Sequence, residues 1–150
     1  MDSEAYREVL LRLSALERRV NALFRVGKAA EVTLDPYRVR VDIGPGEGGG
    51  PVLTDPLPVF VLAAGVVREW TPMTEGEGCA VLSPGGEDFS AFVLRGLYNT
   101  DFVPPDSEAA RHVIAVGDGG TRLTMTEDAV TIASPTTITL RAANDTHVVR

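Results

Sequence analysis

Residues 121–149 read TRLTMTEDAVTIASPTTITLRAANDTHVV and alternate apolar with polar residues along short runs. The apolar positions of these runs are Leu123, Met125, Val130, Ile132, Ile138 and Leu140. A period of two places such side chains on one face of a β-strand. Turn-forming pairs, Glu127-Asp128 and Ser134-Pro135, separate the runs. The segment therefore predicts short strands whose apolar face needs a cover from outside the tail.

Composition favours a mainly β protein. The 150 residues include 15 Gly and 10 Pro, which is typical of many short elements joined by turns. Fourteen basic against 21 acidic residues give a formal charge of −7, which repels phosphate backbones and anionic lipids. A single cysteine, Cys79, excludes a disulfide within the chain and fits folding in a reducing cytoplasm. The first residues lack the pattern of a signal peptide, and no apolar run reaches the roughly 18 residues of a membrane span.

The N-terminal segment has the periodicity of a helix. Its apolar residues alternate in spacings of three and four: Tyr6, Val9, Leu13, Leu16, Val20 and Leu23. This is a heptad seam over three repeats, which predicts either a coiled coil between chains or an amphipathic helix packed on its own domain. Gly27 is expected to end the helix.

Residues 29–98 read as strands and turns. Two alternating runs flank Asp35-Pro36 and predict a hairpin, and GPGEGGGP at 44–51 predicts a flexible loop. Further strands are expected in LPVFVLAAGVVREW at 57–70, CAVLS at 79–83 and SAFVLRGLY at 90–98. About five strands suit a small closed barrel such as the OB-fold. The predicted domains are a helix over 1–28, a barrel over 29–106 and an alternating tail over 107–150.

No catalytic, cofactor or metal site is predicted, and we expect the protein not to be an enzyme. Gly44, Gly46 and Gly49 satisfy G-x-G-x-x-G, but the run leads into Gly50-Pro51 instead of opening a helix. The two histidines, His112 and His147, are far apart and lack the spacing of metal ligands. Cys79 is expected to be a buried structural thiol. Several carboxylates flank turn glycines and are expected to be solvated loop charges: Glu75, Glu77, Glu87 and Asp88.

Several motifs occur in a defined order between residues 30 and 125. They are RVRV at 38–41, TDPLPVF at 54–60, GEGCAVLSPGG at 76–86, AFVLRGLYN at 91–99 and DGGT at 118–121, with Trp70 and Pro72 between the second and the third. In this order the chain resembles the phage baseplate assembly protein V family, the central spike of contractile tails. It departs from that pattern at Pro56, where an aromatic residue is usual, and at Gly78-Cys79, where a Gln-Val-like pair is usual.

The resemblance implies an OB-fold barrel followed by an intertwined three-chain β-helix that forms a needle. Other copies of the chain would then cover the apolar face of the tail. The expected trimer interface comprises Val9, Leu13, Leu16, Val20 and Leu23 of the helix and Leu123, Met125, Val130, Ile132, Ile138 and Leu140 of the tail. At about 1.5–3 kcal/mol for each buried side chain, trimer formation would be inseparable from folding.

The implied function is structural. A homotrimer would nucleate a tail baseplate and pierce the host envelope when the sheath contracts. Its expected partners are baseplate hub and tail tube proteins, and its place is the virion tail after assembly in the bacterial cytoplasm. Members of the family often carry a His-x-His pair that binds an ion at the tip, and this sequence has none. The needle is therefore expected to be short or to be capped by a separate protein.

Two other classes of function compete with a spike. A monomeric OB-fold that binds single-stranded nucleic acid needs exposed aromatic residues on a positively charged groove. The barrel segment offers the aromatic residues but few basic residues among them: Tyr37, Phe60, Trp70, Phe89, Phe92 and Tyr98. A lytic spike needs a fused enzyme domain, and no insertion in this sequence is long enough to hold one.

Overall fold

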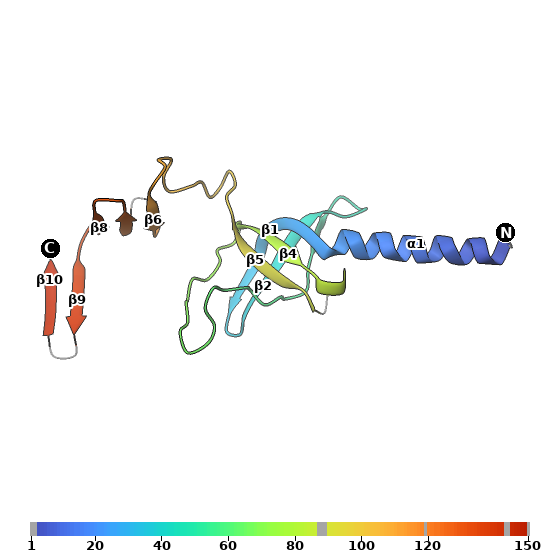
Figure 1. Cartoon of the computed structure of the whole chain (residues 1–150), viewed down its shortest axis with the longest axis horizontal. Helices are drawn as coiled ribbons and strands as arrows, with labels where there is room; N and C mark the ends of the chain where they lie inside the picture. Colours follow the sequence, from blue (N-terminus) through green and yellow to red (C-terminus); the bar gives the residue numbers. More distant parts are fainter. Residues whose placement is uncertain (1–2, 87–89, 119, 143–144, 150) are drawn as a thin grey trace. The chain divides into compact units, whose positions relative to one another are not determined.

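The computed structural model describes residues 3–86, 90–118, 120–142 and 145–149. Backbone contacts divide the chain into two compact units, Met1–Val103 and Pro104–Arg150, which we describe separately. The described part is mainly β, with antiparallel sheets and one N-terminal helix, α1 (Ser3–Leu23) (Figure 1). The expected β class is therefore confirmed.

Helix α1 ends at Leu23, and strand β1 (Phe24–Leu34) follows without an intervening loop. The prediction that Gly27 ends the helix is wrong, because Gly27 lies inside β1 opposite Cys79. A Cβ atom at Gly27 would lie 2.2 Å from the backbone oxygen of Asp42 and 2.8 Å from a methyl group of Val41. Close packing of two strands, and not a helix cap, accounts for this glycine.

The first unit is built on a five-stranded antiparallel sheet in the order β3-β2-β1-β4-β5. Its other strands are β2 (Tyr37–Pro45), β3 (Pro51–Leu53), β4 (Gly78–Leu82) and β5 (Phe92–Leu97), and a short 3-10 turn, η1 (Pro84–Gly86), follows β4. The predicted hairpin is confirmed, since Leu34 pairs with Tyr37 across Asp35-Pro36. Strands β4 and β5 confirm the expected strands in CAVLS and SAFVLRGLY.

Residues 57–60 join β2 to β5. Leu57 and Val39 exchange two backbone hydrogen bonds of 2.9 and 3.0 Å. The amide of Phe60 donates to the carbonyl of Val93 at 2.8 Å, and the amide of Val93 donates to Pro58 at 2.9 Å. Because this segment bonds to both β2 and β5, the sheet closes on itself around a core.

Residues 57–70 do not form the regular strand that their apolar run predicted. Only single bridges occur here, from Leu57, Val59 and Ala64 to residues 39, 93 and 68. Pro56 and Pro58 lack the N–H donors that a continuous ladder needs.

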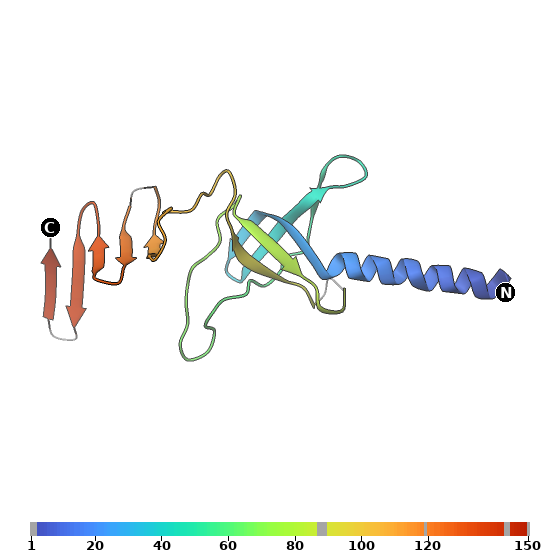
Figure 2. The same cartoon turned by 45° about the horizontal axis from the view of Figure 1, so that its top comes forward.

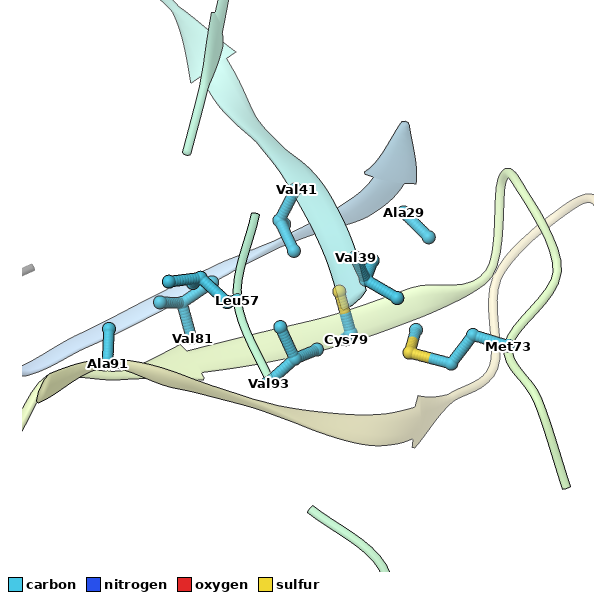
Figure 3. Close-up of a cluster of buried hydrophobic side chains, with 9 residues drawn as sticks. All are labelled: Ala29, Val39, Val41, Leu57, Met73, Cys79, Val81, Ala91 and Val93. Carbon is cyan, nitrogen blue, oxygen red and sulfur yellow. The ribbon is translucent and has the colours of Figure 1, made fainter. Parts of the chain in front are cut away.

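The core lies inside the closed sheet and is small (Figure 3). Alternate residues of β2, Val39 and Val41, are fully buried there, as are Val81 of β4 and Val93 of β5. The remaining buried residues of the cluster are Ala29, Leu57, Met73, Cys79 and Ala91. This core belongs to the first unit alone.

The second unit consists of short strands that follow one another along the chain (Figure 2). Strands β6 (His112–Ala115), β7 (Arg122–Met125) and β8 (Val130–Ala133) form one antiparallel sheet, with β7 in the middle. Strands β9 (Ile138–Ala142) and β10 (Asp145–Val149) form a second. The predicted strands of the alternating tail are therefore confirmed, although no residue described in this unit is fully buried.

Candidate assembly interface

The heptad seam of α1 lies exposed in the single chain. No residue of α1 is buried, because the helix contacts the rest of its unit only near its C-terminal end. There the amide of Ser83 donates to the carbonyl of Leu23 at 3.0 Å. The exposed fractions along the seam are 57% for Val9, 50% for Leu13, 58% for Leu16, 56% for Val20 and 43% for Leu23. Intrachain packing therefore does not cover the seam, and its role between chains stays a prediction.

The register of the second unit aligns apolar residues across three strands. Leu123 of β7 lies opposite Ile114 of β6 and opposite Ile132 of β8. Directly paired residues of an antiparallel sheet share a face, so these three residues form one apolar row. Ile114 was missed by the sequence analysis, although its separation from Val116 already showed the same alternation.

A second row lies beside the first on the same face. Met125 pairs with Val130 on one side and with His112 on the other. We call the two rows together the needle face: Ile114, Leu123, Ile132, His112, Met125 and Val130. Several of its side chains are widely exposed, including Val130 at 68%, Ile114 at 53% and Ile132 at 51%.

Strand β9 continues the alternation beyond the three-stranded sheet. Ile138 and Leu140 lie on one face of β9, because they are separated by one residue. Ile138 is half-buried and Leu140 is 56% exposed. Thus the single chain leaves most of the predicted tail interface without a cover.

A network of charges anchors the start of the second unit. The carboxylate of Asp106 accepts the backbone amides of Ser107 at 2.7 Å and Glu108 at 3.0 Å. Arg122 of β7 reaches the same carboxylate at 3.1 Å and donates to the carbonyl of Pro105 at 2.7 Å. Because Arg122 lies on the sheet face opposite to Leu123, Pro105 and Asp106 bind that opposite face and not the needle face.

The pKa of the Asp106 carboxyl is lowered, first by the amide of Glu108 and also by the amide of Ser107 and the guanidinium groups of Arg111 and Arg122. Partial burial opposes this shift without reversing it. A carboxyl with a lowered pKa in the folded state stabilises that state above its unfolded pKa. Its contribution is lost as the pH falls through the folded pKa.

We therefore expect Asp106→Asn to lower the thermal unfolding midpoint of the second unit at pH 7. The difference from the wild type should shrink near pH 2, where the wild-type carboxyl is itself protonated. Asp118→Asn is the matched control, because Asp118 is an exposed aspartate of the same unit. Circular dichroism at both pH values measures the effect. A deficit of the same size at both values would contradict an electrostatic role for Asp106.

The described residues of the candidate motifs lie in strands, turns and the core. The glycine run begins at Gly44 inside β2 and leads through turns into β3, so it opens no helix that could hold a dinucleotide phosphate. Cys79 is buried in the core, and desolvation together with the nearby Glu77 raises its pKa to about 11. A thiol with that pKa carries almost no thiolate at neutral pH. His147 lies on β10, and its side chain is outside the described residues.

Among the described residues, no group of three or more histidine, cysteine, aspartate or glutamate side chains is arranged to hold a metal ion. Within the described residues, no helix is long and apolar enough to cross a membrane.

Four of the aromatic residues of the first unit form two pairs. Tyr37 and Trp70 meet edge to face at 5.2 Å, and Phe60 lies 6.1 Å from Phe92. Phe89 lies outside the described residues.

Two basic side chains of the first unit contact carboxylates. Arg95 contacts Glu77 at 3.0 Å, and Lys28 contacts Asp101 at 2.8 Å. Binding a phosphate backbone here would require breaking such pairs, so the arrangement does not favour a nucleic-acid groove.

Comparison with known proteins gives one informative similarity. No family model matches the chain. Over 110 residues, the chain is 33% identical to the spike protein of Escherichia phage P2. The matched region covers 73% of this chain and 49% of the phage protein. The chain therefore spans about half the length of the curated relative that it matches. Over the matched region, the chain is similar to a phage spike protein.

Proposed function

We propose that the protein is a homotrimeric structural spike at the centre of a contractile tail baseplate, of the baseplate assembly protein V kind. One observation carries the proposal: the single chain leaves an ordered apolar face uncovered in each of its two units. The α1 seam is one such face, and the needle face is the other. The similarity to the phage P2 spike protein supports the same role.

In this proposal the closed five-stranded sheet is an OB-fold barrel and the second unit is one third of a β-helix. In the second unit the edge strands β6 and β8 have free backbone groups on their outer sides. Edge strands of this kind pair readily with other strands. Three interleaved chains would bring the needle faces to a common axis and surround the apolar rows with apolar neighbours.

The proposed action is mechanical and needs no catalytic step. Contraction of the sheath would drive the tube and the spike into the host envelope. A needle without open sheet edges transmits force without pairing with foreign strands. The barrel would dock on hub and tube proteins, and a separate protein would cap the tip. The place of action would be the virion tail.

The solution mass tests the proposal directly. We expect light scattering or native mass spectrometry at micromolar concentration to give three times the 16.0 kDa of one chain. The reason is that large exposed apolar faces are rare in stable monomers. A monomer of 16.0 kDa would overturn the spike proposal. A monomer that also bound single-stranded DNA below micromolar concentration would favour a nucleic-acid-binding barrel instead.

A further inference from the structure

The heptad positions of α1 place opposite charges where neighbouring helices would meet. With Tyr6, Leu13 and Val20 at position a, and with Leu16 at position d, Arg12 occupies position g. By the same count Glu17 occupies position e of the next heptad. In a parallel bundle, a g residue lies beside the e residue five places further along the adjacent helix, and such pairs set orientation and partner choice.

We propose that Arg12 of one chain and Glu17 of the next form an interchain ion pair that fixes α1 as a parallel, in-register bundle. The occupant of the exposed seam is then a second copy of this chain, and the inference rests on the proposed homotrimer. In an antiparallel arrangement g residues face g residues, so Arg12 and Arg19 would meet like charges. The charge pattern therefore agrees with the parallel orientation that a threefold axis requires.

Both side chains are accessible for this role. The side chain of Arg12 is 79% exposed, and its present contact is with Glu8 on the same helix at 2.6 Å. Glu17 is also exposed. An exposed ion pair within one helix contributes little, so it does not prevent Arg12 from reaching a neighbouring chain.

The surface of α1 beside Glu17 has an open groove at the edge of the seam. An open hollow of about 380 Å³ is lined by Leu16, Glu17, Val20 and Asn21. In a coiled coil, each apolar knob enters a hole between four residues of the facing helix. A hole of this kind consists of residues i, i+3, i+4 and i+7 of one helix. Starting at Leu13, these residues are Leu13, Leu16, Glu17 and Val20. Three of these four residues line the observed hollow.

Charge reversal in full-length chains tests the pair. We expect Arg12→Glu and Glu17→Arg each to lower the thermal midpoint of the trimer by about 3 °C or more, because three attractive pairs become repulsive. Arg18→Glu is the matched control, since position f faces solvent, and it should cause little change. The difference between variant and control should shrink in about 1 M salt, where the screening length is about 3 Å.

Mixing the two variants separates contacts between chains from contacts within a chain. When Arg12→Glu and Glu17→Arg chains are refolded together, every chain keeps its own internal neighbours, including Glu8. Native mass spectrometry should show mixed trimers in excess of the about 75% that random association gives, because only mixed trimers regain opposite charges. A random distribution, or single variants no worse than Arg18→Glu, would overturn the ion pair. A monomeric wild type would instead overturn the homotrimer itself.

Discussion

Ile132→Asp and Ile138→Asp are expected to abolish the trimer, whereas Thr131→Asp and Thr139→Asp are expected to leave it intact. If Ile132 and Ile138 face a threefold axis, each aspartate substitution brings three carboxylates together among apolar side chains. Desolvation and mutual repulsion both oppose their ionisation. The combined cost is roughly 3–5 kcal/mol or more, which is a large part of the stability of an ordinary domain.

The register of the second unit explains why neighbouring residues should differ so strongly. Ile132 lies in the apolar row with Ile114 and Leu123, whereas Thr131 pairs with Thr124 on the opposite face. In the single chain Ile132 is 51% exposed and Thr131 is also exposed. A monomeric sheet would therefore tolerate a charge at either position. Only an assembly that covers one face distinguishes them.

The experiment compares four variants that carry the same new side chain. Native mass and thermal unfolding should show loss of the trimer for the two isoleucine variants and a midpoint close to the wild type for the two threonine variants. Equal tolerance of all four substitutions would show that no axis runs along the needle face or along the apolar face of β9. Equal damage from all four would show that both faces are covered, as in a packed sandwich.

The tail shows how far a simple periodicity predicts structure. Alternation at Leu123, Ile132 and Leu140 predicted strands, and strands β7, β8 and β9 include these residues. The pairing register was not predictable from one sequence, because it depends on which turn closes each hairpin. That register is what reveals Ile114 as a member of the apolar row.

The barrel shows where local patterns mislead. The apolar run at 57–70 resembles a strand, but prolines at 56 and 58 limit it to single bridges that close the sheet. Gly27 resembles a helix cap because it follows an amphipathic helix, yet β1 has already begun at Phe24. In both cases the decisive partner is distant in sequence, Val93 for the closing segment and Asp42 for the glycine. The prolines are visible in the sequence, but these distant partners are not.

Gly27→Ala is expected to destabilise the barrel strongly, although it adds only one methyl group. The new Cβ would lie 2.2 Å from the backbone oxygen of Asp42, and real Cβ atoms do not approach a neighbour that closely. Asp42 belongs to β2, whose carbonyl cannot move aside like the end of a flexible side chain. The strands must separate locally, beside the buried Val41. Overpacking of this kind costs about 1–3 kcal/mol, and more where backbone must shift.

Two further glycines turn this expectation into a controlled comparison. At Gly78 a Cβ would lie 2.3 Å from the backbone oxygen of Leu97, so Gly78→Ala should be equally damaging. At Gly48 nothing lies within 4 Å, so Gly48→Ala should be nearly neutral. The single tryptophan, Trp70, lies in the barrel unit and packs against Tyr37, so its fluorescence during urea unfolding reports on the barrel separately from the tail. Unchanged urea midpoints in Gly27→Ala and Gly78→Ala would mean that strand contact does not require glycine at these positions. If the urea midpoint of the first unit falls while the trimer stays intact, then the fold of this unit and the trimer depend on separate contacts.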